Sequence, residues 1–322
     1  MISRDDVIWA YRMLLGREPE SEAVLAHYAT EVPSLQALRE LFINSPEFQT
    51  SAAMALAPRP LRPVFIGPAM QVELLAPPDK LALLFAKVSA QWHHLGETEP
   101  HWSVLTNESY FQQNFHMNRE AFYASGETEL KLFDATLARA GIDANTLARC
   151  VELGCGVGRA TGPLARRFAQ VVALDISAAH LQVAQDHVQA EALANVVCQH
   201  VAAVDELAGL PLYDLMYSRI VLQHNPPPVI ARLLQDLLAR LRPGGVAYFQ
   251  LPTYKAGYRF TLDAYLQQQN ETHMEMHYFP QPALFALLQQ SGCKVLEFRE
   301  DDAIGLSVTA VSNTVLVQKV AG

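Results

Sequence analysis

The sequence predicts an α/β protein: a doubly wound, mostly parallel, seven-stranded sheet preceded by a small all-helical domain. From residue 149 onward, short apolar segments typical of strands alternate with longer stretches typical of helices, the pattern of a parallel sheet with helices on both faces. The last two segments are joined only by a loop (301–312), which favours an antiparallel hairpin at one edge. The segments read CVEL, VVALD, NVVCQHV, YDLMYS, VAYFQL, KVLEF and TVLVQK.

Residues 1–56 predict a separate helical module. Ser3 and Asp6 have capping-box spacing, Gly16 is suited to ending the first helix, and Ser34 to starting a later one. LLGREPE and FINSPEF resemble a short bacterial helical module of unknown function that occurs in surface-protein and glycan-related contexts. The resemblance implies a packing or docking role, and we expect any protein partner to bind through residues 1–50.

The remaining boundaries follow from changes in composition. Residues 57–78 contain APRPLRP, IGP and APP, which favour an extended linker or a segment wrapped on a neighbouring domain. Residues 79–145 read as helices rich in aromatic and histidine residues, and we interpret them as a cap or lid region. Residues 146–322 hold the predicted sheet.

The composition excludes several classes of protein. Of 322 residues, 50% are hydrophobic and 18% charged, as in a globular protein, and no apolar run approaches the roughly 20 residues of a membrane span. The net charge of −9 and the lack of basic clusters argue against a nucleic-acid substrate. Four scattered cysteines and a beginning without a signal-peptide pattern predict a cytoplasmic location.

A glycine-rich loop follows the first predicted strand. Residues 150–161 read CVELGCGVGRAT, with glycines at Gly154, Gly156 and Gly158. A dinucleotide-binding loop requires G-x-G-x-x-G, but the third glycine would fall on Arg159 or Thr161, depending on the register. The loop therefore favours a cofactor without a pyrophosphate, one that needs a backbone free of side chains.

Over residues 105–320 the chain resembles the class I S-adenosylmethionine-dependent methyltransferases. Four landmarks stand in that family's order: VELGCGVGR, VVALDIS, YDLMYSRIVLQHNPP and LRPGGVAYFQLP. The resemblance implies a Rossmann-like sheet, S-adenosyl-L-methionine as cofactor and S-adenosyl-L-homocysteine as product. We expect a bacterial methyltransferase that acts on a small molecule or a glycan.

The landmarks assign the cofactor-binding residues. Asp175 ends the second strand, where its carboxylate is suited to accept both ribose hydroxyls, and Ile176 is suited to pack on adenine. Asp175 as a helix N-cap is the alternative. By the resemblance, Glu152 helps to hold the methionine amine, although a structural role stays open. Arg159 either reaches the methionine carboxylate or solvates a helix start. Ser218, at the end of the fourth strand, completes this side of the site.

One position departs from the family. An acidic residue after the third strand commonly reads the adenine amine, but Ala202 and Ala203 occupy that position. We expect their backbone groups to take this role, unless a remodelled loop brings in Asp205.

The acceptor site is less defined. His224, after the fourth strand, is the candidate general base for an oxygen acceptor, and orienting the loop or capping the next helix is its alternative role. HMEMHYFP places His273 and His277 in a candidate acceptor-site lid, with Tyr254 nearby; a metal site there is the less favoured reading, and we expect none.

These observations predict methyl transfer to a small-molecule or glycan acceptor, on oxygen, by in-line displacement. A catalytically silent methyltransferase-like scaffold is the first alternative, and a nicotinamide-dependent oxidoreductase the second.

Overall fold

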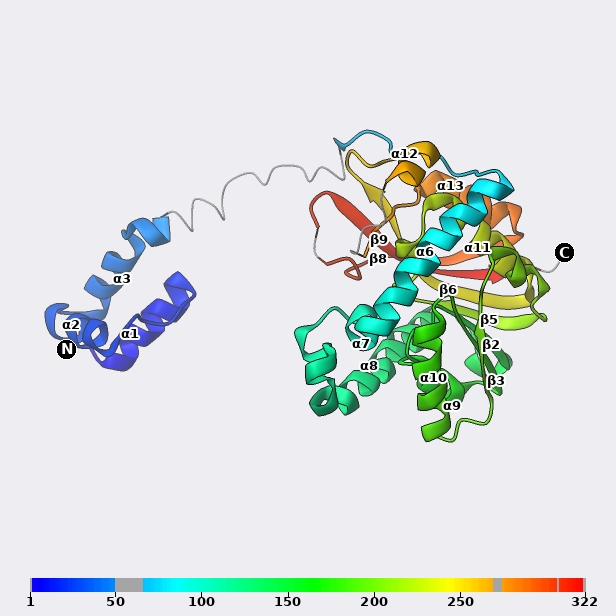
Figure 1. Ribbon diagram of the computed structural model, residues 1–322. Coiled ribbons are helices and arrows are strands. Elements are labelled where there is room, and N and C mark those ends of the chain that lie inside the picture. The colour runs from blue at the N-terminus through cyan, green and yellow to red at the C-terminus, as the bar shows by residue number, and fades with distance from the viewer. Residues whose placement is uncertain (1, 50–65, 269–273, 306, 321–322) are drawn as a thin grey trace. The chain divides into compact units, whose positions relative to one another are not determined.

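The computed structural model describes residues 2–49, 66–268, 274–305 and 307–320, and the chain divides into two units, Met1–Leu61 and Arg62–Gly322 (Figure 1). Each unit has a hydrophobic core of its own. Among the described residues, no helix combines the length and the apolar composition needed to cross a membrane.

The first unit is helical, as predicted. It contains α1 (Arg4–Ala10), a π-helical turn η1 (Tyr11–Leu15), α2 (Glu22–Glu31) and α3 (Leu35–Ile43). The expected capping box is present at Ser3, Gly16 ends η1 in the left-handed conformation with φ 69°, and Ser34 caps α3. Their buried side chains form one cluster: Ile2, Val7, Tyr11, Leu25, Val32, Leu38 and Phe42.

The second unit is built on the predicted seven-stranded sheet. All neighbouring strands are parallel except β9, which is antiparallel to both β6 and β8, so the edge hairpin is also confirmed. The strands lie in the order β4 (Val196–His200), β3 (Gln170–Asp175), β2 (Arg149–Leu153), β5 (Tyr213–Ser218), β6 (Leu241–Lys255), β9 (Ala310–Lys319) and β8 (Cys293–Asp301).

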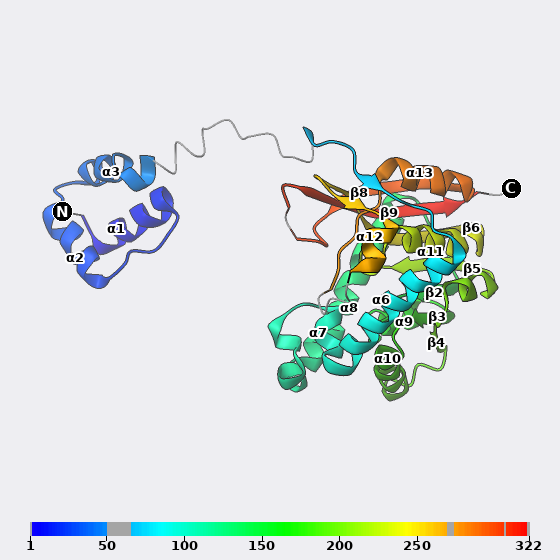
Figure 2. The same cartoon turned by 45° about the horizontal axis from the view of Figure 1, so that its top comes forward.

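Helices cover both faces of this sheet (Figures 1 and 2). The apolar side chains of α6 (Pro78–Thr98), α11 (Pro227–Ala239) and α13 (Gln281–Gln290) pack in one cluster with residues of β2, β5 and β6. On the opposite face, α8 (Gln112–Arg139) and α9 (Thr161–Arg167) pack in a second cluster. The described residues of this unit also form α7 (Pro100–Val104), α10 (Ala178–Ala190) and α12 (Leu262–Gln267), with short 3-10 turns η2 (Glu108–Tyr110), η3 (Ala144–Thr146), η4 (Val204–Gly209) and η5 (Leu222–His224).

The described part of the proline-rich segment lies on the second unit. Strand β1 (Gln71–Val72) pairs in parallel with β7 (Arg259–Phe260), and the Leu262 N–H donates to Glu73 Oε2 at 2.6 Å. Of the two readings of residues 57–78, the wrapped segment therefore describes residues 66–78. The preceding part, 57–65, lies outside the described residues.

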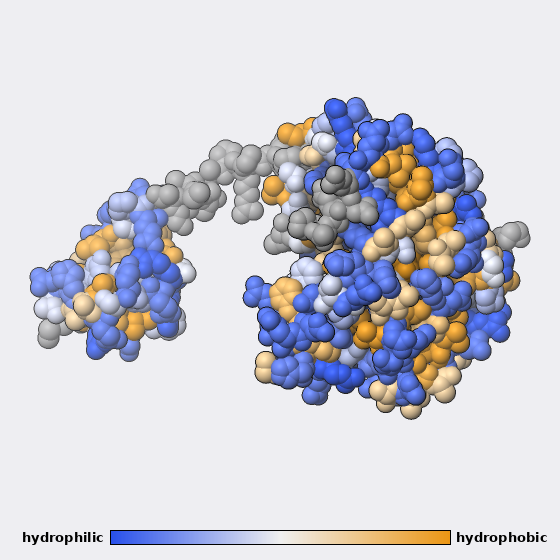
Figure 3. Space-filling view, in the orientation of Figure 1, coloured by the Kyte–Doolittle hydropathy of each residue, from blue (hydrophilic) through white to orange (hydrophobic). Residues whose placement is uncertain are grey.

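The surface of the second unit is mixed in polarity. In Figure 3, apolar side chains lie among polar ones on the face shown. Leu75 and Leu83 are among the exposed apolar residues. Single exposed side chains of this kind are ordinary on globular proteins, and we assign them no binding role.

Candidate active site

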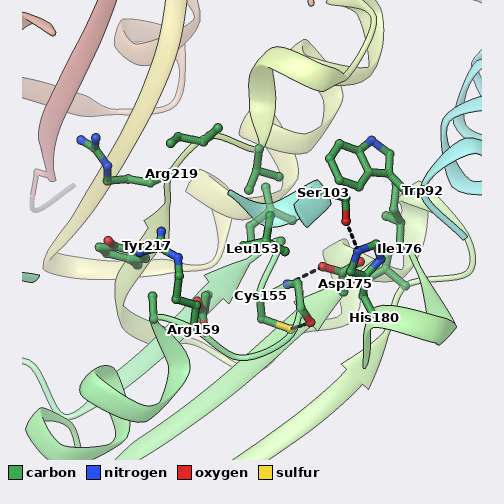
Figure 4. Close-up of a pocket in the computed structure, with 18 of the residues that line it drawn as sticks. Trp92, Ser103, Leu153, Cys155, Arg159, Asp175, Ile176, His180, Tyr217 and Arg219 are labelled. Carbon is green, nitrogen blue, oxygen red and sulfur yellow. Dashed lines mark hydrogen bonds between the residues drawn. The ribbon is translucent and has the colours of Figure 1, made fainter. Parts of the chain in front are cut away.

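A pocket opens at the carboxyl ends of β2, β3 and β5. In the strand order, β2 and β5 are neighbours although β3 and β4 separate them in sequence, so the pocket lies at the switch point where open α/β sheets bind ligands. Figure 4 shows Trp92 and His180 at one end, Arg159, Tyr217 and Arg219 at the other, and Asp175 with Cys155 between them. The lining residues also include Glu129, Glu152, Gly154, Gly156, Ile176, Ile220 and Val221.

The glycine loop forms the floor of this pocket. Its three glycines have φ values of 73°, 54° and 84°, a region that side chains rarely adopt. At Gly154 the space is also closed, because an added Cβ would lie 2.4 Å from Val221 Cγ2. The loop is anchored where the N–H groups of Gly154 and Cys155 donate to the carbonyl of Leu174. The backbone at Gly154 and Gly156, which carries no side chain, fits the predicted cofactor.

Asp175 is buried at the centre of the pocket. Its two oxygens accept the N–H groups of Gly156 and Ser177, each at 2.8 Å. Burial raises the pKa of Asp175, while these hydrogen bonds and nearby histidines act in the opposite direction. The N-cap of α10 is Ser177, whose hydroxyl accepts the His180 N–H, so Asp175 is not the helix cap. Each oxygen of Asp175 retains acceptor capacity for a ligand.

Three residues beside Asp175 were missed by the sequence reasoning: Trp92 from α6, Ser103 from α7 and His180 from α10. His180 Nε2 lies 2.7 Å from Ser103 Oγ, its Nδ1 lies 2.9 Å from Ser177 Oγ, and burial lowers its pKa. The aromatic and histidine content of residues 79–145 indicated a lid. No sequence signal, however, indicated which side chain would reach the pocket.

Glu152 lies in β2 with 3% of its surface exposed. Its Oε2 accepts a hydrogen bond from Thr161 Oγ1 at 2.6 Å. Burial raises the pKa of Glu152 to about 7, although this hydrogen bond opposes the rise. A carboxyl group with this pKa responds strongly to a cation placed beside it.

Arg159 belongs to a buried cluster of charges in which two arginines share the carboxylate of Glu129. We call these two arginines, Arg159 and Arg219, the arginine pair. Glu129 on α8 accepts from both guanidiniums, from Arg159 Nη2 and from Arg219 Nε. Burial alone would raise the pKa of Glu129, but the two arginines lower it overall. Arg159 Nε and the Tyr217 hydroxyl beside the pair are buried and have no hydrogen-bond partner among the described residues. Sequence reasoning had identified only Arg159 of these residues.

His224 lies next to the pocket rather than in its lining. Its Nδ1 is 2.8 Å from the carbonyl oxygen of Glu275, which can only accept, so Nδ1 carries the proton and Nε2 accepts from Gln223 Nε2 at 3.2 Å. The Trp92 ring packs edge-on at 5.1 Å between ring centroids. Burial lowers the pKa of His224 to about 4. This environment favours the loop-orienting role over that of a general base.

The other predicted acceptor residues are also outside the pocket lining. The Tyr254 hydroxyl donates a hydrogen bond to the carbonyl oxygen of Pro68. His277 is buried, with Nδ1 2.8 Å from the Tyr258 hydroxyl and Nε2 3.2 Å from Glu275 Oε2. His273 lies outside the described residues, and the described part of the chain holds no cluster of three metal-ligating side chains.

The remaining cofactor candidates lie around the rim and beneath the floor. Ile176 lines the pocket, and Ser218 is buried with its hydroxyl donating to the carbonyl of Leu153. Val201 lines the pocket, but Ala202 and Ala203 do not belong to the lining. The Ala202 N–H donates to Glu206 Oε2 at 3.1 Å.

A glycine-rich loop after the first strand of the sheet, followed by a buried acid at the end of the next strand, is typical of the class of S-adenosylmethionine-dependent methyltransferases. The sequence model of a family described as "Methyltransferase domain" matches residues 123–297, more than half of the chain. The chain therefore belongs to this methyltransferase family, as the sequence predicted, and S-adenosylmethionine is the cofactor of its class.

Curated relatives match part of the chain. A trans-aconitate 2-methyltransferase from Deinococcus radiodurans is 43% identical over 107 residues, 33% of this chain and 38% of that protein. A ubiquinone biosynthesis O-methyltransferase from Acinetobacter baylyi is 31% identical over 103 residues, 31% of this chain and 42% of that protein. The matches thus span less than half the length of these two relatives.

Solved structures match this chain at lower identity. The N-methyltransferase NodS from Bradyrhizobium japonicum, in complex with S-adenosyl-L-homocysteine, is 14% identical with a TM-score of 0.49, covering 72% of this chain and 98% of that one.

Proposed function

We propose that this protein transfers the methyl group of S-adenosylmethionine to an oxygen atom of a small-molecule acceptor. The observation that carries this proposal is the placement of Asp175 directly over the glycine loop, at the switch point of the sheet. This arrangement offers acceptors for two ribose hydroxyls beside a backbone that a ligand can approach closely.

The residues of the pocket divide the cofactor between them. Asp175 accepts the ribose hydroxyls, Ile176 packs on the adenine, and Glu152 faces the amine. Arg159 binds the carboxylate, because its buried Nε otherwise lacks a partner among the described residues. The backbone of Gly154 and Gly156 lies beneath the methionine chain.

Bound S-adenosylmethionine supplies an already activated methyl group, so the protein needs no covalent nucleophile. Its tasks are to align the acceptor with the methyl group, to exclude water and, for a hydroxyl acceptor, to take up a proton. His224 remains a candidate for that base. We favour the role of holding the loop in place, since both ring nitrogens are engaged.

Oxygen acceptors are supported by the relatives. The name of one relative specifies an O-methyltransferase, and that of another specifies trans-aconitate. These names favour a small molecule over a glycan, which remains the second acceptor class that we propose to screen.

Isothermal titration with S-adenosylhomocysteine and NADH tests the cofactor assignment. We expect binding of the first and none of the second, whereas binding of NADH alone would support the oxidoreductase alternative. A methyl-transfer screen with small acids, phenols and sugars then distinguishes an enzyme from a silent scaffold, since a scaffold binds the cofactor and gives no methylated product.

A further inference from the structure

The arginine pair carries more positive charge than its own carboxylate neutralises. Glu129 is shared by Arg159 and Arg219, so one negative charge faces two positive charges. The side chains of these three residues are only 9–10% exposed, which limits screening by solvent. A buried excess charge of this kind is costly unless a further anion completes it, and the cofactor carboxylate that the proposed function places on Arg159 is one such anion.

Unpartnered donors lie at the same end of the pocket. Arg159 Nε and the Tyr217 hydroxyl have no partner among the described residues, and both residues line the pocket. Burial raises the pKa of Tyr217 well above its ordinary value, so its hydroxyl remains a donor. These donors, together with the excess charge, describe an anion-binding environment inside the pocket.

The two arginines reach the pocket from different sides. Arg159 follows the glycine loop, where the proposed function places the carboxylate of the cofactor. Arg219 directly follows β5, and the next two residues, Ile220 and Val221, also line the pocket. In Figure 4, Arg219 extends away from the glycine loop and lies across the pocket from Trp92.

Arg219 is held by neutral partners as well as by Glu129. Its Nη1 donates to Thr314 Oγ1 at 3.1 Å, and it also forms a side-chain hydrogen bond with Tyr248. The Thr314 hydroxyl in turn donates a hydrogen bond to Asp301 Oδ2 at 2.7 Å. A guanidinium has five N–H donors in a planar fork, more than these three partners use, and the fork matches a carboxylate.

The backbone at Arg219 is fixed in place. Ile220 has φ 58°, a conformation that is strained for a β-branched residue. The Ile220 N–H donates to Gln250 Oε1 at 3.1 Å, and Gln250 Nε2 in turn donates to Gln223 and Ser312. This network keeps the residues after β5 in one conformation before an acceptor binds.

We propose that Arg219 binds a carboxylate of the methyl acceptor, so that the acceptor is a small carboxylic acid. The inference rests on the proposed function and deepens it. A carboxylate is also the oxygen nucleophile that this pocket can use without a base. The acceptor oxygen forms a bond to the methyl carbon while the carbon–sulfur bond breaks. The electron pair of the broken carbon–sulfur bond goes to sulfur. The product is a methyl ester, and no proton is transferred.

Titration of the full chain saturated with S-adenosylhomocysteine tests this assignment. Malonate, succinate, fumarate and citrate are the probes, and dimethyl succinate is the uncharged control. We expect at least one acid to bind and the diester not to bind. Arg219→Gln should weaken that acid about 10- to 100-fold, as expected for a lost charge-assisted hydrogen bond, and change the affinity for S-adenosylhomocysteine by less than about 2-fold.

Two further variants interpret the result. Arg219→Lys keeps the charge without the fork and should bind the acid with intermediate affinity, which also provides a test if Arg219→Gln does not fold. Arg299→Gln removes an arginine whose side chain is 60% exposed, and it should leave both affinities unchanged. When S-adenosylmethionine is used in place of S-adenosylhomocysteine, mass spectrometry should detect a methyl ester of the acid that binds.

Results that contradict the assignment of Arg219 differ from results that contradict the proposed function. If no acid binds the S-adenosylhomocysteine complex, or if Arg219→Gln binds the acid as tightly as the wild type, the assignment of Arg219 is wrong. It is also wrong if Arg219→Gln loses S-adenosylhomocysteine as strongly as Arg159→Gln does, because the arginine pair then serves only the cofactor. Failure of the wild-type protein to bind S-adenosylhomocysteine would instead overturn the proposed function itself.

Discussion

At the scale of single residues, Asp175 has two roles that one experiment can separate. Its oxygens hold the N–H groups of Gly156 and Ser177, and their remaining lone pairs face the pocket. We expect Asp175→Ala to weaken binding of S-adenosylhomocysteine by about 2–4 kcal/mol, because two hydrogen bonds to a charged acceptor are lost. Titration calorimetry measures this, and Asp186→Asn on the exposed side of α10 is the control. Unchanged affinity in a folded Asp175→Ala protein would contradict the ribose assignment.

Glu152 predicts a pH dependence of cofactor binding. Its pKa is raised to about 7 by burial, so below pH 7 the free protein holds a proton there. The amine cation of S-adenosylhomocysteine favours the ionised carboxylate, so binding releases that proton. The affinity should therefore rise with pH, by up to about 10-fold per unit, and level off above about pH 7.

Calorimetric titrations with S-adenosylhomocysteine in buffers of different ionisation enthalpy give the number of protons released on binding. Glu152→Gln should bind more weakly at pH 8, without the release and without the slope. An identical slope in this variant would show that another group titrates.

His224 predicts a small kinetic effect. With both ring nitrogens engaged and a pKa lowered to about 4 by burial, it is neutral and poorly basic at pH 7. We expect His224→Gln to lower the rate by about 10-fold or less, whereas loss of a general base costs about 10²–10⁴. The pH–rate profiles of wild type and variant should coincide between pH 5.5 and 8. A larger loss, together with the disappearance of an acidic limb, would restore the base assignment.

At the scale of elements, Gln250 on β6 connects the loop after β5 to β9. It is fully buried, and its amide contacts Ile220, Gln223 and Ser312. Gln250→Leu leaves these groups without hydrogen-bond partners, and each buried unpaired group lowers the stability by about 1–3 kcal/mol. We expect a lower free energy of unfolding in urea and a reduced rate with nearly unchanged cofactor affinity. Gln289→Leu, on the exposed face of α13, should change neither quantity. A rate equal to that of wild type would show that Gln250 has only a stabilising role.

The elements of the sheet were predictable, whereas much of the pocket lining was not. Each strand contains a short apolar run, although β6 extends well beyond its run, over 15 residues (Leu241–Lys255). The glycine loop and Asp175 stand at fixed distances from these runs. Glu129 and Trp92, in contrast, lie on long helices, and only the packing of α8 and α6 brings them to the pocket. Gly126 of α8 is one sequence feature that relates to this packing. An added Cβ there would lie 2.2 Å from the carbonyl oxygen of Arg159, so a glycine lets α8 approach the loop closely. His224 was placed on the correct side of the sheet, but its burial depends on the packing of Trp92 and residues 274–279.

At the scale of the whole molecule, the two units predict separate roles for the ends of the chain. Among the described residues, the core cluster of Met1–Leu61 consists of residues of that unit, and the pocket lining belongs to Arg62–Gly322. We propose that the helical module serves in docking rather than in cofactor binding. A chain that begins at Arg62 should therefore bind S-adenosylhomocysteine with an affinity within about 2-fold of the full chain, a difference of less than about 0.5 kcal/mol.

A chain that begins at Asp79 provides the sharper comparison. It additionally removes β1, which pairs with β7, and Glu73, which accepts the Leu262 N–H. We expect this shorter chain to melt several degrees lower than the chain from Arg62, since exposing these backbone groups and the partly buried Val72 and Leu74 costs about 1–3 kcal/mol. Differential scanning calorimetry with and without S-adenosylhomocysteine measures both effects. If the chain from Arg62 folds but fails to bind, the helical module belongs to the catalytic unit. If the two shortened chains melt together, the segment before α6 is a linker in function as well as in composition.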